Sequence, residues 1–324
     1  MTGWTLHFDM RAPDFGAPGP DLYGAALEMA SWADERGVTA LVTSEHHGES
    51  DGFLPSPLVM AGALAARTSR AVISVNALVL SLRDPIAAAE EALVVHQLSG
   101  GRLAITAVPG YVPEEFAMFG IDYAERADRF ERHVAAFVAA LSGEPFEHDG
   151  RTVRVTPGPV GGARPMVMLG GSTPAAARRA ARLADGFAPP RPDDRLRDVY
   201  LAECAAAGRE PGLVVMPPPF MSIFVAEDPD AYWHVLGPHA LHELRCYGRW
   251  ARNDPASPYR DIDDVAAARD SGFYRVLTPD ECIALGRELP DVGFLFKPLI
   301  GGLPPEHAWT SLELFATKVL PALA

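Results

Sequence analysis

The chain has 324 residues, 48% of them hydrophobic and 22% charged, which is typical of a folded globular protein and excludes disordered, collagen-like and coiled-coil chains. Its 28 basic and 42 acidic residues give a net charge of −14, and such a charge repels nucleic acids and anionic membranes. The 3 cysteines are scattered, no apolar run is long enough to span a membrane, and no secretory signal is visible, so we expect a cytoplasmic protein without disulfides or a metal site.

Short apolar stretches alternate with Ala-rich amphipathic stretches along the first half of the chain. Helices are predicted to begin at Asp21, at Ser56-Pro57 and at Asp84-Pro85, where a capping residue or a first-turn proline suits a helix start. Strands that are apolar on both faces are typical of parallel sheets covered by helices on both sides. The predicted strands are 4–10, 40–46, 71–80 and 102–108.

The second half repeats this alternation with two longer interruptions. Residues 110–164 are predicted to hold a helix around 123–141 and a hairpin turning at Asp149-Gly150. Residues 228–275 are predicted to hold a helix near 232–252, and Thr278 to Glu281 form the pattern of a capped helix start. The predicted strands are 165–170, 186–190 and 292–299, with a further strand inside 213–227, whose start is irregular because of three prolines. A last helix is expected from about Pro305 to Leu320.

Eight strand–helix units of this length predict the α/β class and a closed (β/α)8 TIM barrel, in preference to a doubly wound sheet. The two long segments are then insertions after strands 4 and 7. Because no low-complexity linker interrupts the chain, residues 1–324 are predicted to form a single domain. A barrel carries its chemistry at the C-terminal ends of its strands, so the residues there are the candidates for a functional site.

The second predicted strand ends in Ser44-Glu45-His46-His47. Side chains alternate across a strand, so the two histidines are expected on opposite faces and a chelate of both is not predicted. A histidine at this end of a barrel strand can donate or accept a proton near neutral pH. His46 is therefore the candidate catalytic residue, and the alternative is a histidine that is simply packed and hydrogen-bonded.

The fifth predicted strand runs into Gly170-Gly171-Ser172-Thr173-Pro174 and a helix. Two glycines allow a ligand to approach the backbone closely, and the amides at the helix start with two hydroxyls predict an anion site. Inside a barrel the expected anion is a phosphate. Arg178, Arg179 and Arg182 add positive charge nearby, and the alternative is a capped helix with solvated arginines.

Two other strand ends offer contacts to a ligand. Gly110 permits close contact with a flat molecule, and Tyr111 can stack on it or hydrogen-bond to it. Asn76 is polar in an otherwise apolar strand and is expected to need a partner, either a ligand ring or a neighbouring strand. His239 and His242 share one helix face, for which a substrate-side wall is favoured over a metal site.

Segments in order along nearly the whole chain resemble the bacterial-luciferase-like family of flavin-dependent oxidoreductases. Among them are TSEHHG (43–48), QLSGGRL (97–103), PGYVPEEFAMFG (109–120) and LGGSTPAAARRAARLADG (169–186). The resemblance implies a (β/α)8 barrel with an insertion after the fourth strand. It also implies FMN, or in some branches the deazaflavin F420, at the C-terminal mouth, and a homodimer.

The resemblance further implies roles for particular residues. Pro109 stands where luciferase has an arginine for the flavin phosphate, so that contact is either missing or supplied by Arg178 or Arg179. His46 aligns with the histidine that luciferases use for acid–base work. The flavin phosphate is placed at Gly171, Ser172 and Thr173 beside Gly170, and the ring near Gly110 and Tyr111 and against Asn76–Leu78, where Asn76–Ala77 is the expected non-proline cis peptide.

The favoured activity is a monooxygenase that uses reduced FMN and O2 to oxygenate a small organic substrate through a C4a-hydroperoxyflavin, with reduced flavin supplied by a separate reductase. One alternative is an F420-dependent hydride-transfer enzyme. The acidic tail of F420 requires more basic groups near the mouth than the arginines of 178–182 supply. Others are a flavin-binding protein without turnover and a lysine aldolase at Lys297. Phe220, His239, His242 and Trp250 are candidate substrate contacts.

Overall fold

The computed structural model describes residues 3–252, 259, 262–288 and 293–323. These residues fall into two compact units, which we describe one at a time. Unit 1 takes its residues from 1–41, 46–55 and 218–324, and unit 2 from 42–45 and 56–217. The chain passes from one unit to the other within strand β2 (Ala40–Thr43). The single domain expected from the sequence stays a prediction.

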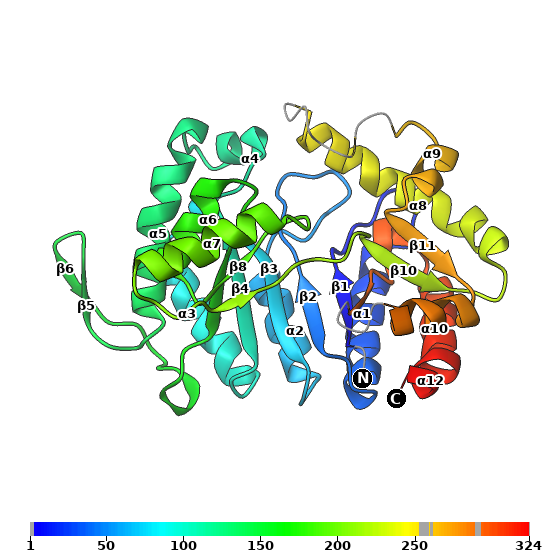
Figure 1. Cartoon of the computed structure of the whole chain (residues 1–324), viewed down its shortest axis with the longest axis horizontal. Coiled ribbons are helices and arrows are strands. Elements are labelled where there is room, and N and C mark those ends of the chain that lie inside the picture. The colour runs from blue at the N-terminus through cyan, green and yellow to red at the C-terminus, as the bar shows by residue number, and fades with distance from the viewer. Residues whose placement is uncertain (1–2, 253–258, 260–261, 289–292, 324) are drawn as a thin grey trace. The chain divides into compact units, whose positions relative to one another are not determined.

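The centre of unit 2 is a parallel sheet. Its strands pair in the order β3, β4, β7, β8, β9, and Figure 1 shows them from cyan to green. Helix α6 packs on β7, on β8 and on helix α7. The strands are β3 (Val72–Val79), β4 (Leu103–Val108), β7 (Met166–Gly170), β8 (Gly186–Ala188) and β9 (Leu213–Val214), and the helices are α2 (Pro57–Ala66), α3 (Pro85–Leu98), α6 (Pro174–Leu183) and α7 (Asp194–Ala206). Helix α7 was not predicted.

The segment between β4 and β7 carries elements of its own. Helix α4 (Pro113–Met118), which was not predicted, comes before α5 (Arg126–Ala140) and the antiparallel hairpin of β5 (Phe146–His148) and β6 (Arg151–Val153). Asp149 and Gly150 form the hairpin turn with φ of 48° and 70°, the left-handed conformation that an Asp-Gly turn requires. The predicted helix and hairpin are therefore confirmed.

The observed starts of two helices, α3 and α1, can be compared with the starts predicted from capping residues. The Asp84 carboxylate accepts hydrogen bonds from the amides of Ile86 and Ala87, so the predicted start of α3 is confirmed. The prediction that Asp21 caps a helix is wrong, because α1 (Gly19–Glu35) already begins after Pro18. A proline in the first turn needs no hydrogen-bond partner, so the helix begins there and Asp21 lies inside its first turn.

Unit 1 holds two parallel strand pairs. Strand β1 (Trp4–Phe8) pairs with β12 (Phe294–Phe296), and β10 (Ser222–Val225) pairs with β11 (Tyr274–Leu277). Residue 292, where the last strand was expected to begin, lies outside the described residues. The remaining helices are α8 (Pro229–Trp250), α9 (Val265–Asp270), α10 (Pro279–Glu288), α11 (Pro305–Leu314) and α12 (Leu320–Leu323).

Three details of unit 1 bear on the sequence predictions. The segment 213–227, predicted to contain one strand with an irregular start, holds two strands, β9 in unit 2 and β10 in unit 1. The prolines at 217–219 between them cannot donate hydrogen bonds to a ladder. Strand β11 was not predicted. The capping pattern is confirmed: the Thr278 amide donates to Glu281 Oε2 at 2.8 Å, and the Glu281 amide donates to Thr278 Oγ1 at 3.3 Å.

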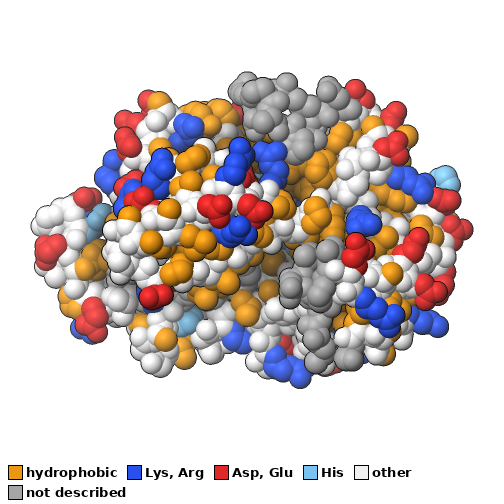
Figure 2. Space-filling model, in the orientation of Figure 1, with side chains coloured by type: hydrophobic (Ala, Val, Ile, Leu, Met, Phe, Trp, Pro, Cys, Tyr) orange, Lys and Arg blue, Asp and Glu red, His pale blue; other side chains and the backbone are white. Residues whose placement is uncertain are grey.

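The described surface is mixed in charge. On the face drawn in Figure 2, acidic and basic side chains are interspersed among hydrophobic ones. Among the described helices, none combines the length and the apolar character that crossing a membrane demands.

Candidate functional site

The turn that follows β7 in unit 2 presents open backbone amides. Within the described part of the chain, the amides of Gly171 and Ser172 have no hydrogen-bond acceptor. Ser172 and Thr173 are exposed, and α6 begins at Pro174 directly after them. Thr173 Oγ1 accepts from the Ala176 amide at 3.2 Å and so caps the helix. Open amides at a helix start can bind an anion, and the anion site expected at this turn stays a prediction.

The two glycines of this turn are required for a reason other than the one predicted. A Cβ atom on Gly170 would lie 2.7 Å from Val108 Cγ1, and one on Gly171 would lie 2.5 Å from the Cβ of Ala176. Gly171 also has a φ of +153°, which side chains rarely adopt. The space beside these glycines is therefore filled by the protein itself, and the close packing fixes the direction of the amides.

The arginines of α6 are largely paired within unit 2. Arg179 Nε donates to Glu131 Oε2 at 3.1 Å, and Arg182 lies 3.5 Å from both Glu131 and Glu203. Arg178 is exposed and forms no ion pair with the described residues. Of the two arginines expected to replace the missing phosphate contact, only Arg178 has its guanidinium open to an anion.

The ends of β3 and β4 lie next to each other in the sheet. The peptide bond Asn76–Ala77 is cis, as the resemblance implies, and the register between β3 and β4 shifts between Asn76 and Leu78. Asn76 is exposed at this irregularity, and the partner expected for it, a ligand ring or a neighbouring strand, stays a prediction. Its register partner Thr106 is 2% exposed, and Thr106 Oγ1 has no hydrogen-bond partner within the described residues. A buried hydroxyl of this kind can serve a bound polar ligand.

Gly110 and Tyr111 follow β4. A Cβ on Gly110 would lie 2.7 Å from Val79 Cγ1 and 3.0 Å from Phe116, and its φ of +78° is left-handed, so packing requires a glycine here too. The Tyr111 side chain is 44% exposed, and its carbonyl accepts from the Tyr123 hydroxyl at 3.1 Å. The backbone of Tyr111 is thus fixed while its ring is accessible to a flat ligand.

In unit 1, His46 is packed between aromatic rings. Strand β2 ends at Thr43, so the alternation expected for His46 and His47 does not extend to them, and both are 8% exposed. The His46 ring stacks on Trp250 with centroids 3.8 Å apart and an interplanar angle of 19°. Phe53 meets it edge-on at 4.9 Å.

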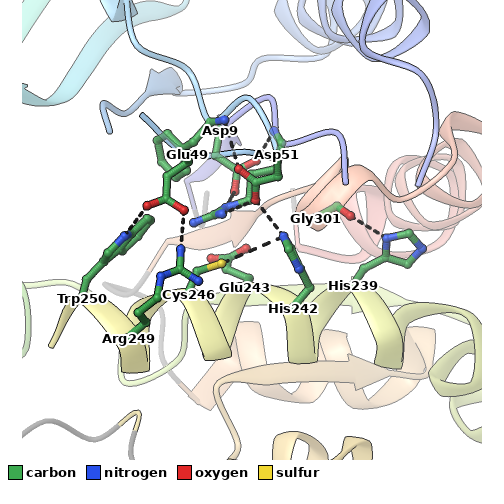
Figure 3. A network of polar contacts seen from close by, with 12 residues as sticks. Asp9, Glu49, Asp51, His239, His242, Glu243, Cys246, Arg249, Trp250 and Gly301 are labelled. Atoms are coloured by element: carbon green, nitrogen blue, oxygen red, sulfur yellow. Dashed lines mark hydrogen bonds and ion pairs between the residues drawn. The ribbon is translucent and has the colours of Figure 1, made fainter. Parts of the chain in front are cut away.

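Trp250 is itself held in place by Glu49. Trp250 Nε1 donates to Glu49 Oε1 at 2.7 Å, and Arg249 forms an ion pair with the other carboxylate oxygen (Figure 3). Trp250 was predicted as a substrate contact, and here it serves as the stacking partner of His46. The role of Glu49 was not predicted, because its partners lie 200 and 201 residues away along the chain.

Unit 1 also contains a network of charged side chains (Figure 3). Arg11 forms an ion pair with Asp51, whose Oδ2 lies 2.7 Å from His242 Nε2. Burial alone raises the pKa of Asp51, but the hydrogen bonds from His242 and Arg11 and the charge of Arg11 outweigh it and lower the pKa to about 2. The hydrogen bond to Asp51 raises the pKa of His242 to about 9. The two residues therefore form an ion pair at neutral pH.

Lys297 belongs to the same network. Its amine forms an ion pair with Glu243 and lies 3.8 Å from Asp9 Oδ2. Burial and the charge of Glu243 raise the pKa of Asp9. Glu243 Oε2 and Asp9 Oδ2 have no hydrogen-bond partner within the described residues. A lysine that neutralises two buried carboxylates acts as a structural cation, which argues against the aldolase alternative.

The two histidines of α8 have different partners. His239 Nδ1 lies 2.7 Å from the carbonyl oxygen of Gly301, and burial lowers the pKa of His239. His242 pairs with Asp51 instead. Figure 3 shows the two side chains directed at these separate groups, so they do not form a chelating pair.

Comparisons of the sequence with a family model and with known proteins agree on one family. The family model for luciferase-like monooxygenases matches residues 5–293. The 4-hydroxyprotoasukamycin monooxygenase of Streptomyces nodosus subsp. asukaensis is 30% identical over 333 residues, which cover 91% of this chain and 85% of that protein. An F420-dependent glucose-6-phosphate dehydrogenase of Nakamurella multipartita is 25% identical and covers 91% of both chains.

Solved structures share the fold at lower sequence identity. The oxygenating constituent of 3,6-diketocamphane monooxygenase from Pseudomonas putida, solved in complex with FMN, has a TM-score of 0.75 and 18% identity, covering 100% of this chain and 99% of that chain. An F420-dependent secondary alcohol dehydrogenase has a TM-score of 0.68 and 16% identity, covering 100% of both chains. The chain therefore has the predicted (β/α)8 barrel fold and belongs to the luciferase-like monooxygenase family of flavin-dependent oxidoreductases.

Proposed function

We propose that the protein is a monooxygenase that uses reduced FMN and O2 to oxygenate a small organic substrate. The observation that carries the proposal is the turn at Gly170–Thr173, in which the Gly171 and Ser172 amides are open and the two glycines leave no room for a side chain. A helix start with such amides suits a compact phosphate dianion. The exposed Asn76 and Tyr111 and the buried Thr106 hydroxyl, all in unit 2, supply contacts suited to a flat ring.

The charges around α6 favour FMN over F420. F420 carries an acidic tail beyond its phosphate and needs additional cations. In unit 2 the carboxylates of Glu131 and Glu203 already pair with Arg179 and Arg182, which leaves Arg178 as the open cation of this helix. The single phosphate group of FMN can be paired by Arg178, the open cation of this helix, whereas the polyanionic tail of F420 would need several cations.

His46 is proposed as the group that transfers a proton during turnover. When bound, the flavin supplies the redox chemistry, and the protein's own task is to hold the reactants and exclude water. Stacking on Trp250 and edge contact with Phe53 fix the imidazole plane, so that its nitrogens keep one orientation. A histidine side chain held in one orientation is a suitable group for transferring a proton to or from a bound reactant.

The reduced flavin is proposed to come from a separate reductase. The name of one relative, the oxygenase component of a flavin-dependent trigonelline monooxygenase from Acinetobacter baylyi, points to a two-component system; it is 28% identical over 131 residues, 40% of this chain and 36% of that protein. In a two-component system, the oxygenase must bind reduced FMN that the reductase has released. The phosphate turn of unit 2 is suited to that task.

The cofactor that supports turnover distinguishes a monooxygenase that uses reduced FMN from an F420-dependent enzyme. The purified full-length chain is mixed with chemically reduced FMN or with reduced F420, and oxygen consumption and product formation are followed with a panel of aldehydes, ketones and aromatic compounds. We expect an oxygenated product to form with reduced FMN and O2, and none without the protein. Anaerobic turnover with reduced F420, without oxygenated product in the presence of reduced FMN and O2, would identify an F420-dependent enzyme instead.

Replacing Gly171 by alanine is expected to weaken FMN binding at least about tenfold. The new methyl group would lie 2.5 Å from the Ala176 Cβ, so the turn must move away from the start of α6 and its amides change direction. The loss of one charge-assisted hydrogen bond, worth about 1.5–3 kcal/mol, accounts for such a factor. Affinity is measured by anaerobic fluorescence titration.

Gly208→Ala is the matched control for this variant. Gly208 also has a positive φ, +63°, but a Cβ there would contact nothing within 4 Å. It should therefore lose some stability to backbone strain and retain its FMN affinity. Equal affinity losses in both variants would show that the effect of Gly171→Ala is general destabilisation.

A further inference from the structure

We propose that Asp51, His242 and Cys246 form a binding site for a divalent transition-metal ion of the zinc type, with a fourth position open to water. All three residues belong to unit 1, and their ligand atoms lie within 4.8 Å of one another. His242 and Cys246 are four residues apart on α8, so they share one helix face. Figure 3 shows both side chains directed toward Asp51.

The distances suit a tetrahedral ion. Asp51 Oδ2 lies 2.7 Å from His242 Nε2, and Cys246 Sγ lies 4.0 Å from the same nitrogen. Ligand atoms bound to one tetrahedral Zn²⁺ are about 3.3–3.8 Å apart, given bond lengths of about 2.0–2.3 Å. Small side-chain rotations therefore convert the present hydrogen-bonded arrangement into a coordinated one, with the ion in place of the proton on His242.

The donor set is typical of zinc. One thiolate, one imidazole nitrogen and one carboxylate oxygen are the three ligand types that zinc binds in proteins, and three protein ligands with an open position are characteristic of its non-structural sites. Cys246 Sγ lies 4.0 Å from His242 Nε2, so the thiol and the imidazole are already neighbours, as two ligands of one ion must be.

Metal binding also preserves the charge of the buried network. The network contains three carboxylates, Asp9, Asp51 and Glu243, balanced by the cations Arg11, Lys297 and protonated His242. When a divalent ion displaces one proton from the His242 imidazolium and one from the Cys246 thiol, the net charge is unchanged and both protons leave to solvent. The exchange therefore avoids adding an uncompensated charge to a buried site.

Asp51 is already oriented for such a role. Its Oδ1 accepts from the Phe53 amide at 3.2 Å, and Arg11 donates to its Oδ2. Hydrogen bonds of this kind hold a ligating carboxylate in a fixed orientation. Asp51 and Cys246 are buried, whereas the His242 side chain is 25% exposed and provides the side from which an ion can enter.

Cobalt spectroscopy of the full-length protein tests this site. The metal-free chain, prepared by dialysis against a chelator, is titrated with Co²⁺ and then with Zn²⁺. We expect one equivalent of Co²⁺ to produce a thiolate-to-cobalt charge-transfer band and the visible bands of a four-coordinate ion, and Zn²⁺ to abolish both. Cys246→Ser should remove the charge-transfer band, and His242→Gln should weaken Co²⁺ binding at least about tenfold.

Cys204→Ser is the matched control, because Cys204 is equally buried but lies in unit 2 on α7. It should leave the cobalt spectrum unchanged. The proposal is overturned if the wild-type chain gives no thiolate band at stoichiometric Co²⁺, or if the band survives Cys246→Ser. If Cys246→Ser fails to fold, the His242→Gln variant assigns the band to this site, and unchanged Co²⁺ binding by that variant also overturns the proposal. The result does not depend on the flavin reaction.

Discussion

His46→Ala is expected to lower turnover with reduced FMN by roughly 100-fold or more, the usual contribution of a positioned acid–base group. The affinity for FMN should remain nearly unchanged, because the residues proposed to bind the phosphate belong to a different part of the chain. The stack on Trp250 and the contact with Phe53 hold the imidazole in one orientation, and alanine removes the proton-transferring group without introducing a charge. Single-turnover kinetics, with reduced flavin premixed with the protein, measure the effect directly.

His47→Ala is the matched control for this variant. His47 is the next residue and is equally buried, at 8% exposure. Both substitutions remove a packed imidazole and should cost similar stability, but only His46→Ala should slow turnover. If the two variants lose activity equally, or if His46→Ala retains the wild-type rate, His46 has no role in proton transfer.

Lys297→Met is expected to destabilise the protein by about 3–5 kcal/mol. The substitution retains an unbranched apolar side chain but removes the cation that pairs with Glu243 and lies near Asp9. Both carboxylates are almost completely buried, and one oxygen of each already has no partner within the described residues. Denaturant-induced unfolding followed by tryptophan fluorescence gives the change in the free energy of unfolding.

Two further variants distinguish a lost ion pair from a packing defect. The double variant Lys297→Met with Glu243→Gln should recover part of the lost stability, since it no longer buries an unpaired glutamate. Lys318→Met removes the other lysine of the chain, which is exposed, and should change stability by about 0.5 kcal/mol at most. A small effect of Lys297→Met would contradict a structural role for the ion pair.

The parts of the fold predicted from sequence are those determined by local signals. Asp84, the Asp149-Gly150 turn and the Thr278–Glu281 pattern act through neighbours a few residues away, and each occurs as expected. Asp21 shows the limit of such patterns, because the helix already begins at Gly19 and has Pro20 in its first turn. Strand β11 was missed because its stability depends on pairing with β10, about 50 residues earlier, which no short pattern reveals.

The candidate site likewise contains a part that local sequence signals predict and parts that they do not. Gly170–Thr173 is contiguous, so its geometry could be predicted, although the reason for its glycines is packing against Val108 and Ala176. The charged network could not be predicted, because Asp51 and His242 are 191 residues apart. Asn76 was expected to need a partner because the strand was assumed to be regular, and the register shift changes its environment.

The central claim is that the amides of Gly171–Thr173 bind the phosphate of the flavin, and comparing FMN with riboflavin tests it most directly. The two molecules share the same ring and differ by the phosphate alone. Anaerobic titration of the wild-type chain should show reduced FMN binding at least about tenfold more tightly than reduced riboflavin, and Gly171→Ala should remove most of that difference. Equal affinities of the wild-type chain for the two flavins would contradict the account.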